Sequence, residues 1–152
     1  MLRLRSLQEH PSAYTSSAEE EASTADTWSV ERCAGREGNV MIGAFAGHIL
    51  VGTGGVERQP RAKQRHKATV YGMYVAPEHG GRGIGQAVLE ALLATARGWG
   101  GIEQVQLTVT TDNAPAERLY RAAGFRSFGR ERRAIKVGDA YYDKDHMVLF
   151  LD

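Results

Sequence analysis

The residues best suited to chemistry in this sequence are four glycines within six positions, Gly80, Gly81, Gly83 and Gly85. Apolar residues recur four positions apart directly after them, which predicts an amphipathic helix that begins at Ile84. The first turn of a helix exposes backbone N–H groups without partners and carries a partial positive charge. Glycines let another molecule approach that backbone closely, so the pattern is suited to binding a phosphate or diphosphate. The same glycines are also expected of a tight turn without a ligand.

Two common nucleotide-binding loops match this stretch poorly. A P-loop ends in Gly-Lys-Ser or Gly-Lys-Thr, whereas Gln86 and Ala87 follow Gly85. The dinucleotide fingerprint G-x-G-x-x-G/A would require glycine or alanine where Val88 stands, and it usually lies in an early βαβ unit. Another kind of phosphate site is therefore favoured.

Three further elements must position this loop. Residues 69–75 are rich in strand formers, and Pro77 would end that strand because proline has no N–H to donate. Apolar residues alternate over 105–109, which predicts a second strand. A helix over 114–123 would follow, with a polar cap near Asn113 and Gly124 in the left-handed position that ends many helices.

Both regions resemble motifs of the GNAT superfamily of N-acetyltransferases. The loop and the strand before it resemble the family's acetyl-CoA loop, Gln/Arg-x-x-Gly-x-Gly/Ala, with Gly80 standing where Gln or Arg is expected and Arg82 two residues on. The string NAPAERLYRAAGF, from Asn113 to Phe125, resembles the second motif, N-x-x-A-x-x-L-Y-x-x-x-G-F. One helix and one strand separate the motifs, as the family pattern requires.

The resemblance implies a fold and a cosubstrate. The fold would be the α+β (α/β) acyl-CoA N-acyltransferase fold, a central mixed, mostly antiparallel sheet flanked by helices, in a single domain over residues 1–152. Acetyl-CoA would be the cosubstrate, with no metal. The implied cofactor-binding residues are Met73, Tyr74, Val75, Gly80, Gly81, Arg82, Gly83, Ile84, Gly85, Gln86 and Asn113. Backbone amides of 82–86 would bind the pyrophosphate, and the strand edge at 73–75 would pair with the pantetheine arm.

The resemblance also implies a catalytic residue. A primary amine would attack the thioester, a tetrahedral intermediate would form, and Tyr120 would protonate the leaving thiolate as general acid. A backbone N–H near Val75 would stabilise the oxyanion. Asn113 would bond the pantetheine arm or fix the loop. The alternative is that Asn113 only caps a helix and Tyr120 only packs.

The sequence does not place a general base. The strand before Pro77 carries no Asp or Glu. Glu57, His66 and Asp145 are candidates, and a chain of water molecules is an equal alternative.

Composition excludes several function classes. The 152 residues are 42% hydrophobic and 24% charged with a net charge of +1, which fits one globular domain and gives no bulk affinity for nucleic acid. Cys33 is the single cysteine, so an intrachain disulfide is excluded and the cytoplasm is the expected compartment. No apolar run approaches the roughly 18 residues of a membrane span, and the start lacks a signal-peptide core. The histidines lack metal-binding spacing.

The remaining stretches complete the expected fold. Residues 1–36 predict two short helices, the second of which carries Trp28 and Cys33, with little room for the strand that usually opens the family fold. Residues 38–75 predict a meander whose basic link, Arg58 to Lys67, is expected to be a solvated loop. Residues 125–152 predict a hairpin turning at 138–139. The last strand of this hairpin is apolar, which is compatible with a homodimer.

Two other functions are alternatives to enzymatic acetyl transfer. A non-catalytic acyl-CoA sensor of the same fold is favoured by the departure at Gly80 and by the lack of an obvious base. A structural subunit in which CoA is incidental is the other. The acceptor is a small-molecule amine or a peptide or protein amine that the sequence does not identify.

Overall fold

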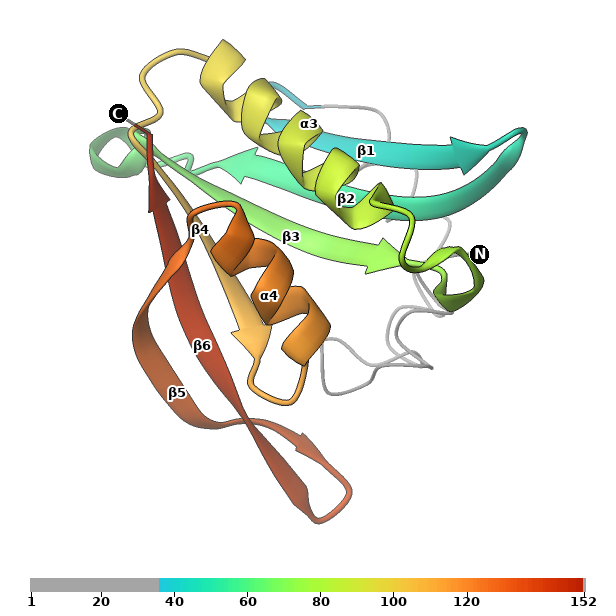
Figure 1. Cartoon of the computed structure of the whole chain (residues 1–152). Helices are drawn as coiled ribbons and strands as arrows, with labels where there is room; N and C mark the ends of the chain where they lie inside the picture. The colour runs from blue at the N-terminus through green and yellow to red at the C-terminus, as the bar shows by residue number, and fades with distance from the viewer. Residues whose placement is uncertain (1–35, 152) are drawn as a thin grey trace.

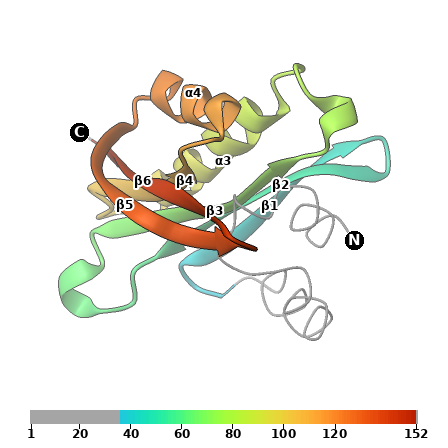
Figure 2. The same ribbon diagram turned by 90° about the horizontal axis from the view of Figure 1, so that it is seen from below.

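The computed structural model describes residues 36–151, so the helices expected before residue 36, with Trp28 and Cys33, lie outside the described part. Six strands form one sheet in the order β1-β2-β3-β4-β6-β5. The elements are β1 Asn39–Ala46, β2 Ile49–Arg58, η2 Ala62–Gln64, β3 Lys67–Val75, η3 Pro77–His79, α3 Ile84–Gly98, β4 Gln104–Thr110, α4 Ala114–Ala122, β5 Arg126–Val137 and β6 Ala140–Phe150. Both α-helices lie on the same face of the sheet (Figure 1, Figure 2).

The sheet is mixed and mostly antiparallel, which confirms the expected fold class. Only β3 and β4 pair in parallel, and the other four neighbouring pairs are antiparallel. The connection between the parallel strands runs through α3, as a parallel pair requires. None of the helices in residues 36–151 is both long and apolar enough to cross a membrane.

Helix α3 packs closely on β2 because β2 is rich in glycine. A Cβ atom at Gly54 would lie 2.8 Å from side-chain atoms of both Val88 and Leu92 of α3. Strand β2 is irregular in this region, since the β2–β3 register shifts between Thr53 and Gly55. The main core fills the space between the sheet and the helices; its buried members are Val56, Ala68, Val70, Val88, Leu89, Leu92, Leu93, Ala96, Ile102, Val105, Leu107, Val109, Tyr120, Phe125 and Met147.

Strands β3 and β4 form a short seam and then diverge. Their register consists of the pairs Lys67↔Gln104, Ala68↔Val105 and Thr69↔Gln106, all at the start of both strands. Beyond this seam the two strands run apart (Figure 1). The glycine-rich loop follows the far end of β3, and α4 follows the far end of β4, so both motifs lie at the open end.

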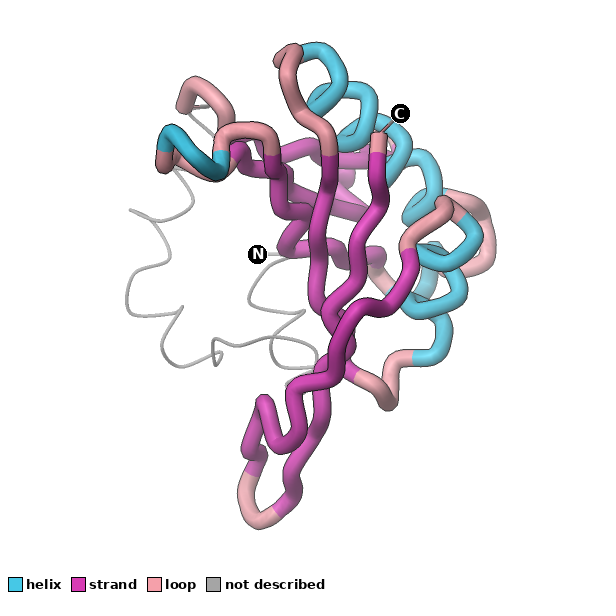
Figure 3. The backbone as a smooth tube through the Cα atoms, turned by 90° about the vertical axis from the view of Figure 1, so that its left-hand side faces the viewer, coloured by secondary structure: helices cyan, strands magenta, loops and turns pink. Residues whose placement is uncertain are grey.

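The predicted final hairpin is confirmed, with Gly138 at φ 59° in its turn. Its tip projects beyond the rest of the sheet (Figure 3). The β5–β6 register shifts between Glu131 and Ile135. Within that shift Arg133 has φ 54°, and its backbone N–H donates to Asp143 Oδ1 at 2.8 Å.

Candidate active site

The glycine-rich loop presents its backbone to the outside. Gly81 and Gly83 have φ values of 73° and 77°, which side chains rarely adopt, and a Cβ atom at either would meet nothing within 4 Å. Gly83 is the N-cap of α3, no side chain caps this helix, and its first turn holds no acidic residue. The first-turn amides thus have the exposure and the electrostatic setting that a diphosphate requires.

Gly80 differs from its glycine neighbours. Its φ of −64° and ψ of 158° are ordinary for any residue, and its N–H donates to the carbonyl oxygen of Pro77 at 3.0 Å. The amide of Gly80 is therefore used to close the η3 turn. Arg82 is exposed, and Gln86 is exposed with its side-chain amide on Glu90 Oε1 at 3.0 Å.

The start of α3 is held where three elements meet. A Cβ atom at Gly85 would lie 3.4 Å from Leu119 Cδ2 of α4 and 3.7 Å from Val75 Cγ2 of β3. The N–H of Ala76 donates to the carbonyl of Val51 at 2.8 Å, which fixes the exit of β3. The structure therefore brings α4 against the loop and the end of β3, although a helix and a strand separate α4 from them in the sequence.

Asn113 caps α4. Its Oδ1 accepts the N–H of Ala116 at 3.3 Å, and its own N–H donates to the carbonyl of Thr110 at 3.0 Å. This is the helix-cap role that the sequence left open, and it fixes the helix against the end of β4. A contact between Asn113 and a pantetheine arm stays a prediction.

Tyr120 is placed inside the fold by the same helix. Its side chain is buried, and its ring packs edge-to-face against Phe125 with centroids 6.0 Å apart. The N–H of Phe125 donates to the carbonyl of Tyr120 at 3.0 Å. Gly124 between them has φ 102°, as predicted for the residue that ends the helix. Both ends of α4 are thus fixed, and Tyr120 with them.

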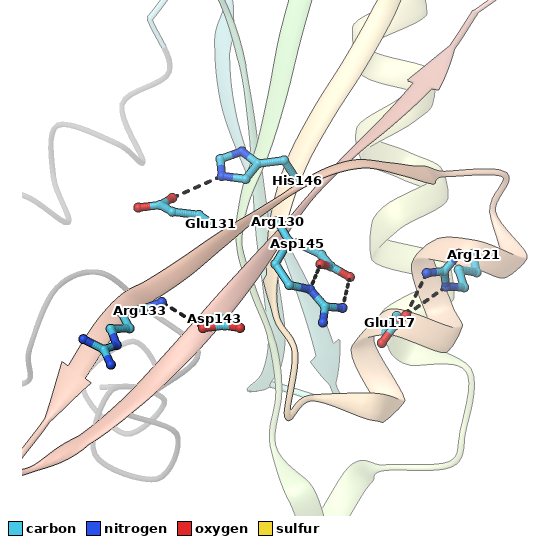
Figure 4. A network of polar contacts seen from close by, with 8 residues as sticks. All are labelled: Glu117, Arg121, Arg130, Glu131, Arg133, Asp143, Asp145 and His146. Carbon is cyan, nitrogen blue, oxygen red and sulfur yellow. Dashed lines mark hydrogen bonds and ion pairs between the residues drawn. The ribbon is translucent and has the colours of Figure 1, made fainter.

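The three base candidates fall in different places. Asp145 is buried and forms a two-point ion pair with Arg130, with Nε–Oδ1 at 2.8 Å and Nη2–Oδ2 at 3.4 Å (Figure 4). The hydrogen bond and charge of Asp145 raise the pKa of Arg130. His66 directly precedes β3, at the closed end of the seam, where β3 and β4 are paired. Glu57 of β2 is the register partner of Thr69, one of the β3 residues that pair with β4. Asn39 Nδ2 lies 3.5 Å from the carboxylate of Glu57.

Sequence reasoning missed a polar cluster on β5 and β6. His146 Nε2 lies 3.1 Å from Glu131 Oε2, and Lys144 is buried two residues before His146. Burial lowers the pKa of Lys144, and the nearby charge of Glu131 opposes that effect. Strand alternation was the available signal, because it places Lys144 and His146 on one face and Asp143 and Asp145 on the other. Within residues 36–151, no three His, Cys, Asp and Glu side chains gather as a metal site would require.

Sequence comparison identifies relatives over most of the chain. The model of the Acetyltransferase (GNAT) family matches residues 4–125. The chain is 42% identical over 105 residues to the N-alpha-acetyltransferase RimI of Mycobacterium tuberculosis, covering 68% of this chain and 63% of RimI. It is 28% identical over 143 residues to the L-amino acid N-acetyltransferase AaaT of Escherichia coli, covering 91% of this chain and 87% of AaaT.

Solved structures share the fold at low sequence identity. An acetyltransferase of the GNAT family from Streptococcus pneumoniae superposes with a TM-score of 0.74 at 22% identity, over 90% of this chain and 79% of that one. The protein yncA of Salmonella typhimurium, solved with its cofactor acetyl-CoA, superposes with a TM-score of 0.70 at 19% identity, over 91% of this chain and 76% of that one. Since the family model spans most of the chain and the solved relatives share its sheet and helices, this protein belongs to the acetyltransferase (GNAT) family of enzymes.

Proposed function

We propose that this protein transfers an acetyl group from acetyl-CoA to a primary amine, the α-amino group of an amino acid or of a polypeptide. One observation carries the proposal: the exposed helix start at Gly83, the end of β3 and the helix of Tyr120 meet at the open end of the β3–β4 seam. The names of RimI and AaaT describe transfer to an N-alpha position and to L-amino acids, which is the basis for the acceptor class.

The chain's own residues supply binding and orientation. The amides from Arg82 to Gln86 would hold the diphosphate, helped by the positive end of the α3 dipole. The edge of β3 from Met73 to Val75 would align the pantetheine arm in the space that the diverging strands leave. The single domain over residues 1–152, the cytoplasmic location and a homodimer stay predictions.

The chemistry would be a direct transfer. Acetyl-CoA supplies an activated acetyl thioester; a backbone N–H near Val75 would donate to the developing oxyanion. Tyr120 would give its phenolic proton to the sulfur as the thiolate leaves, and a phenol suits this task because it stays protonated at neutral pH. Packing against Phe125 and the capped helix keep the phenol in one orientation.

The test is release of free thiol from acetyl-CoA in the presence of a panel of amino acids, peptides and small amines. Tyr120→Phe is expected to lower kcat by about 10²-fold or more, as for loss of a general acid, with CoA affinity by calorimetry unchanged. Tyr141→Phe is the matched control, because Tyr141 is 50% exposed on the projecting hairpin and should leave kcat unchanged.

Two outcomes would contradict the proposal. Equal turnover of the Tyr120→Phe variant and the wild type would remove Tyr120 as the acid. Tight CoA binding without thiol release across the whole panel would favour the acyl-CoA sensor.

A further inference from the structure

His146 lies beside the open end of the seam, on the sheet face away from α3 and α4. Its register partner on β4 is Thr108, and β4 has already left β3 at Gln106. Residues directly opposite on antiparallel strands point to the same face. Val109 and Leu107 of β4 belong to the core under the helices, so Thr108 and His146 face the other side.

The close-up view shows the same separation. His146 and Glu131 extend to one side of the hairpin, while Arg130 and Asp145 extend toward Glu117 of α4 (Figure 4). Thr108 is exposed, and the side chain of His146 is 37% exposed. A molecule that reaches the diverging strands from this face would therefore meet the imidazole.

The imidazole is held from two directions. Its Nε2 lies 3.1 Å from Glu131 Oε2, and its ring packs edge-on against Phe128 with centroids 6.0 Å apart. With Nε2–H donating to the carboxylate, Nδ1 carries the lone pair. A base oriented by a carboxylate is the arrangement that catalytic histidines use to accept protons.

The charges around the ring come from two strands. Glu131 on β5 and Lys144 on β6 carry opposite charges and lie on the same face as the ring. From β4, the described residues on this face beside the ring are Gln106, Thr108 and Thr110, which carry no charge. Arg126 of β5, the register partner of Val148, lies on this face as well, so Arg126, Glu131 and Lys144 are the charged residues that the register of β5 and β6 places beside the imidazole.

We propose that His146, oriented by Glu131, is the general base that takes a proton from the acceptor ammonium, directly or through one water. The inference rests on the proposed function. The ammonium N–H bond breaks and its proton passes to Nδ1, leaving a neutral amine. The amine nitrogen forms the C–N bond, the C–S bond breaks, and the thiolate takes the Tyr120 proton. The second N–H proton of the attacking nitrogen restores Tyr120 through water, and His146 releases its proton to solvent.

The three earlier candidates fit this role less well. Asp145 is engaged by Arg130 on the helix side of the sheet. His66 and Glu57 are placed at the closed end, where β3 and β4 are still paired. His146 combines a proton-accepting group with a position at the open end.

The experiment measures kcat/KM against pH for the full-length protein, with acetyl-CoA and a peptide acceptor bearing a free α-amine. His146→Gln is expected to lose at least about ten-fold at pH 6.5, and the loss should close above pH 9, where an α-amine of pKa about 8 is already neutral. On the acid side of the profile, the pH at which kcat/KM declines therefore moves toward the pKa of the amine. His66→Gln is the matched control and should keep the wild-type profile.

Two further measurements separate a lost base from a damaged fold. Glu131→Gln keeps a hydrogen-bonding group beside the ring and should lower kcat/KM at pH 6.5 by a smaller factor than His146→Gln. Added imidazole should restore part of the activity of a His146→Gly variant and none of the activity of Tyr120→Phe.

The outcomes distinguish this inference from the proposed function. Wild-type protein that releases no thiol with any acceptor would defeat the proposed function, and this inference with it. If the wild type is active, either of two results would overturn the assignment of His146 alone. The pH profile of His146→Gln would superpose on that of the wild type, or its kcat/KM would be lowered equally at every pH and imidazole would restore no activity.

Discussion

At the scale of single residues, the glycine-rich loop divides into positions that need glycine and one that does not. Gly81 and Gly83 have positive φ values, whereas Gly80 has φ −64° and ψ 158°. The fold therefore does not impose glycine where related loops carry Gln or Arg. The departure at Gly80 removes a side chain at a position whose backbone conformation any residue can adopt.

Restoring the missing side chain should tighten CoA binding. Gly80→Arg places a cation beside the diphosphate, and a solvent-exposed pair of this kind is expected to strengthen CoA affinity by up to about five-fold, less at high salt. A Cβ atom there would lie 3.1 Å from the Pro77 carbonyl oxygen, so a small shift of the turn must accompany it. Titration calorimetry with CoA at low and high salt measures the effect.

The control for this variant is Gly81→Arg, which adds the same charge at φ 73°. Strain at that position should lower stability by about 1–2 kcal/mol. Equal CoA affinity for Gly80→Arg and wild type at both salt concentrations would show that the position does not reach the diphosphate.

Residue types alone could not reveal the polar pair on the hairpin. The interaction between Glu131 and His146 spans 15 positions and depends on the β5–β6 register, which shifts twice, between Ser127 and Gly129 and between Glu131 and Ile135. A one-residue slip would turn each side chain to the other face. The glycine loop and Tyr120 were predictable because each lies within a short local motif.

At the scale of elements, sequence patterns predicted the strands and both α-helices of residues 36–151, including the start of α3 at Ile84. Local patterns determine these elements because each buries one face against a common core. The close approach of α3 to β2 was not predictable in the same way. It depends on which glycines face the helix: Gly52 and Gly54 approach side chains of α3, whereas Gly55 approaches Met41 and Tyr71.

The contact between α3 and β2 should not tolerate a methyl group. Gly54→Ala places Cβ 2.6 Å from Met73 Sδ and 2.8 Å from both Val88 Cγ1 and Leu92 Cδ1, so we expect a loss of about 1–3 kcal/mol in unfolding free energy. Gly98→Ala, at the end of the same helix with nothing within 4 Å, should be neutral or stabilising by up to about 1 kcal/mol. Denaturant titration measures both, and equal midpoints for the two variants would refute the packing argument.

At the scale of the whole molecule, the described chain consists of two halves that are each continuous in sequence. Strands β1, β2 and β3 with α3 form the first, and β4, α4, β5 and β6 form the second. Three register pairs of the seam join the halves through the sheet, and Arg58 of the first half donates from Nη2 to the carbonyl of Gly100 in the link between them at 2.7 Å. The proposed sites for acetyl-CoA and for the acceptor both lie where the halves separate.

The short seam means that the two halves are suited to fragment complementation. The link between them passes through Gly100 and Gly101, both exposed and both with positive φ, so a break there removes no regular hydrogen-bonded element. Polypeptides 1–100 and 101–152, expressed together, are expected to reassociate and recover thiol release. Because the amides of residues 82–86 belong to one fragment and Tyr120 to the other, recovered activity would report that the two pieces had re-formed the divided sheet.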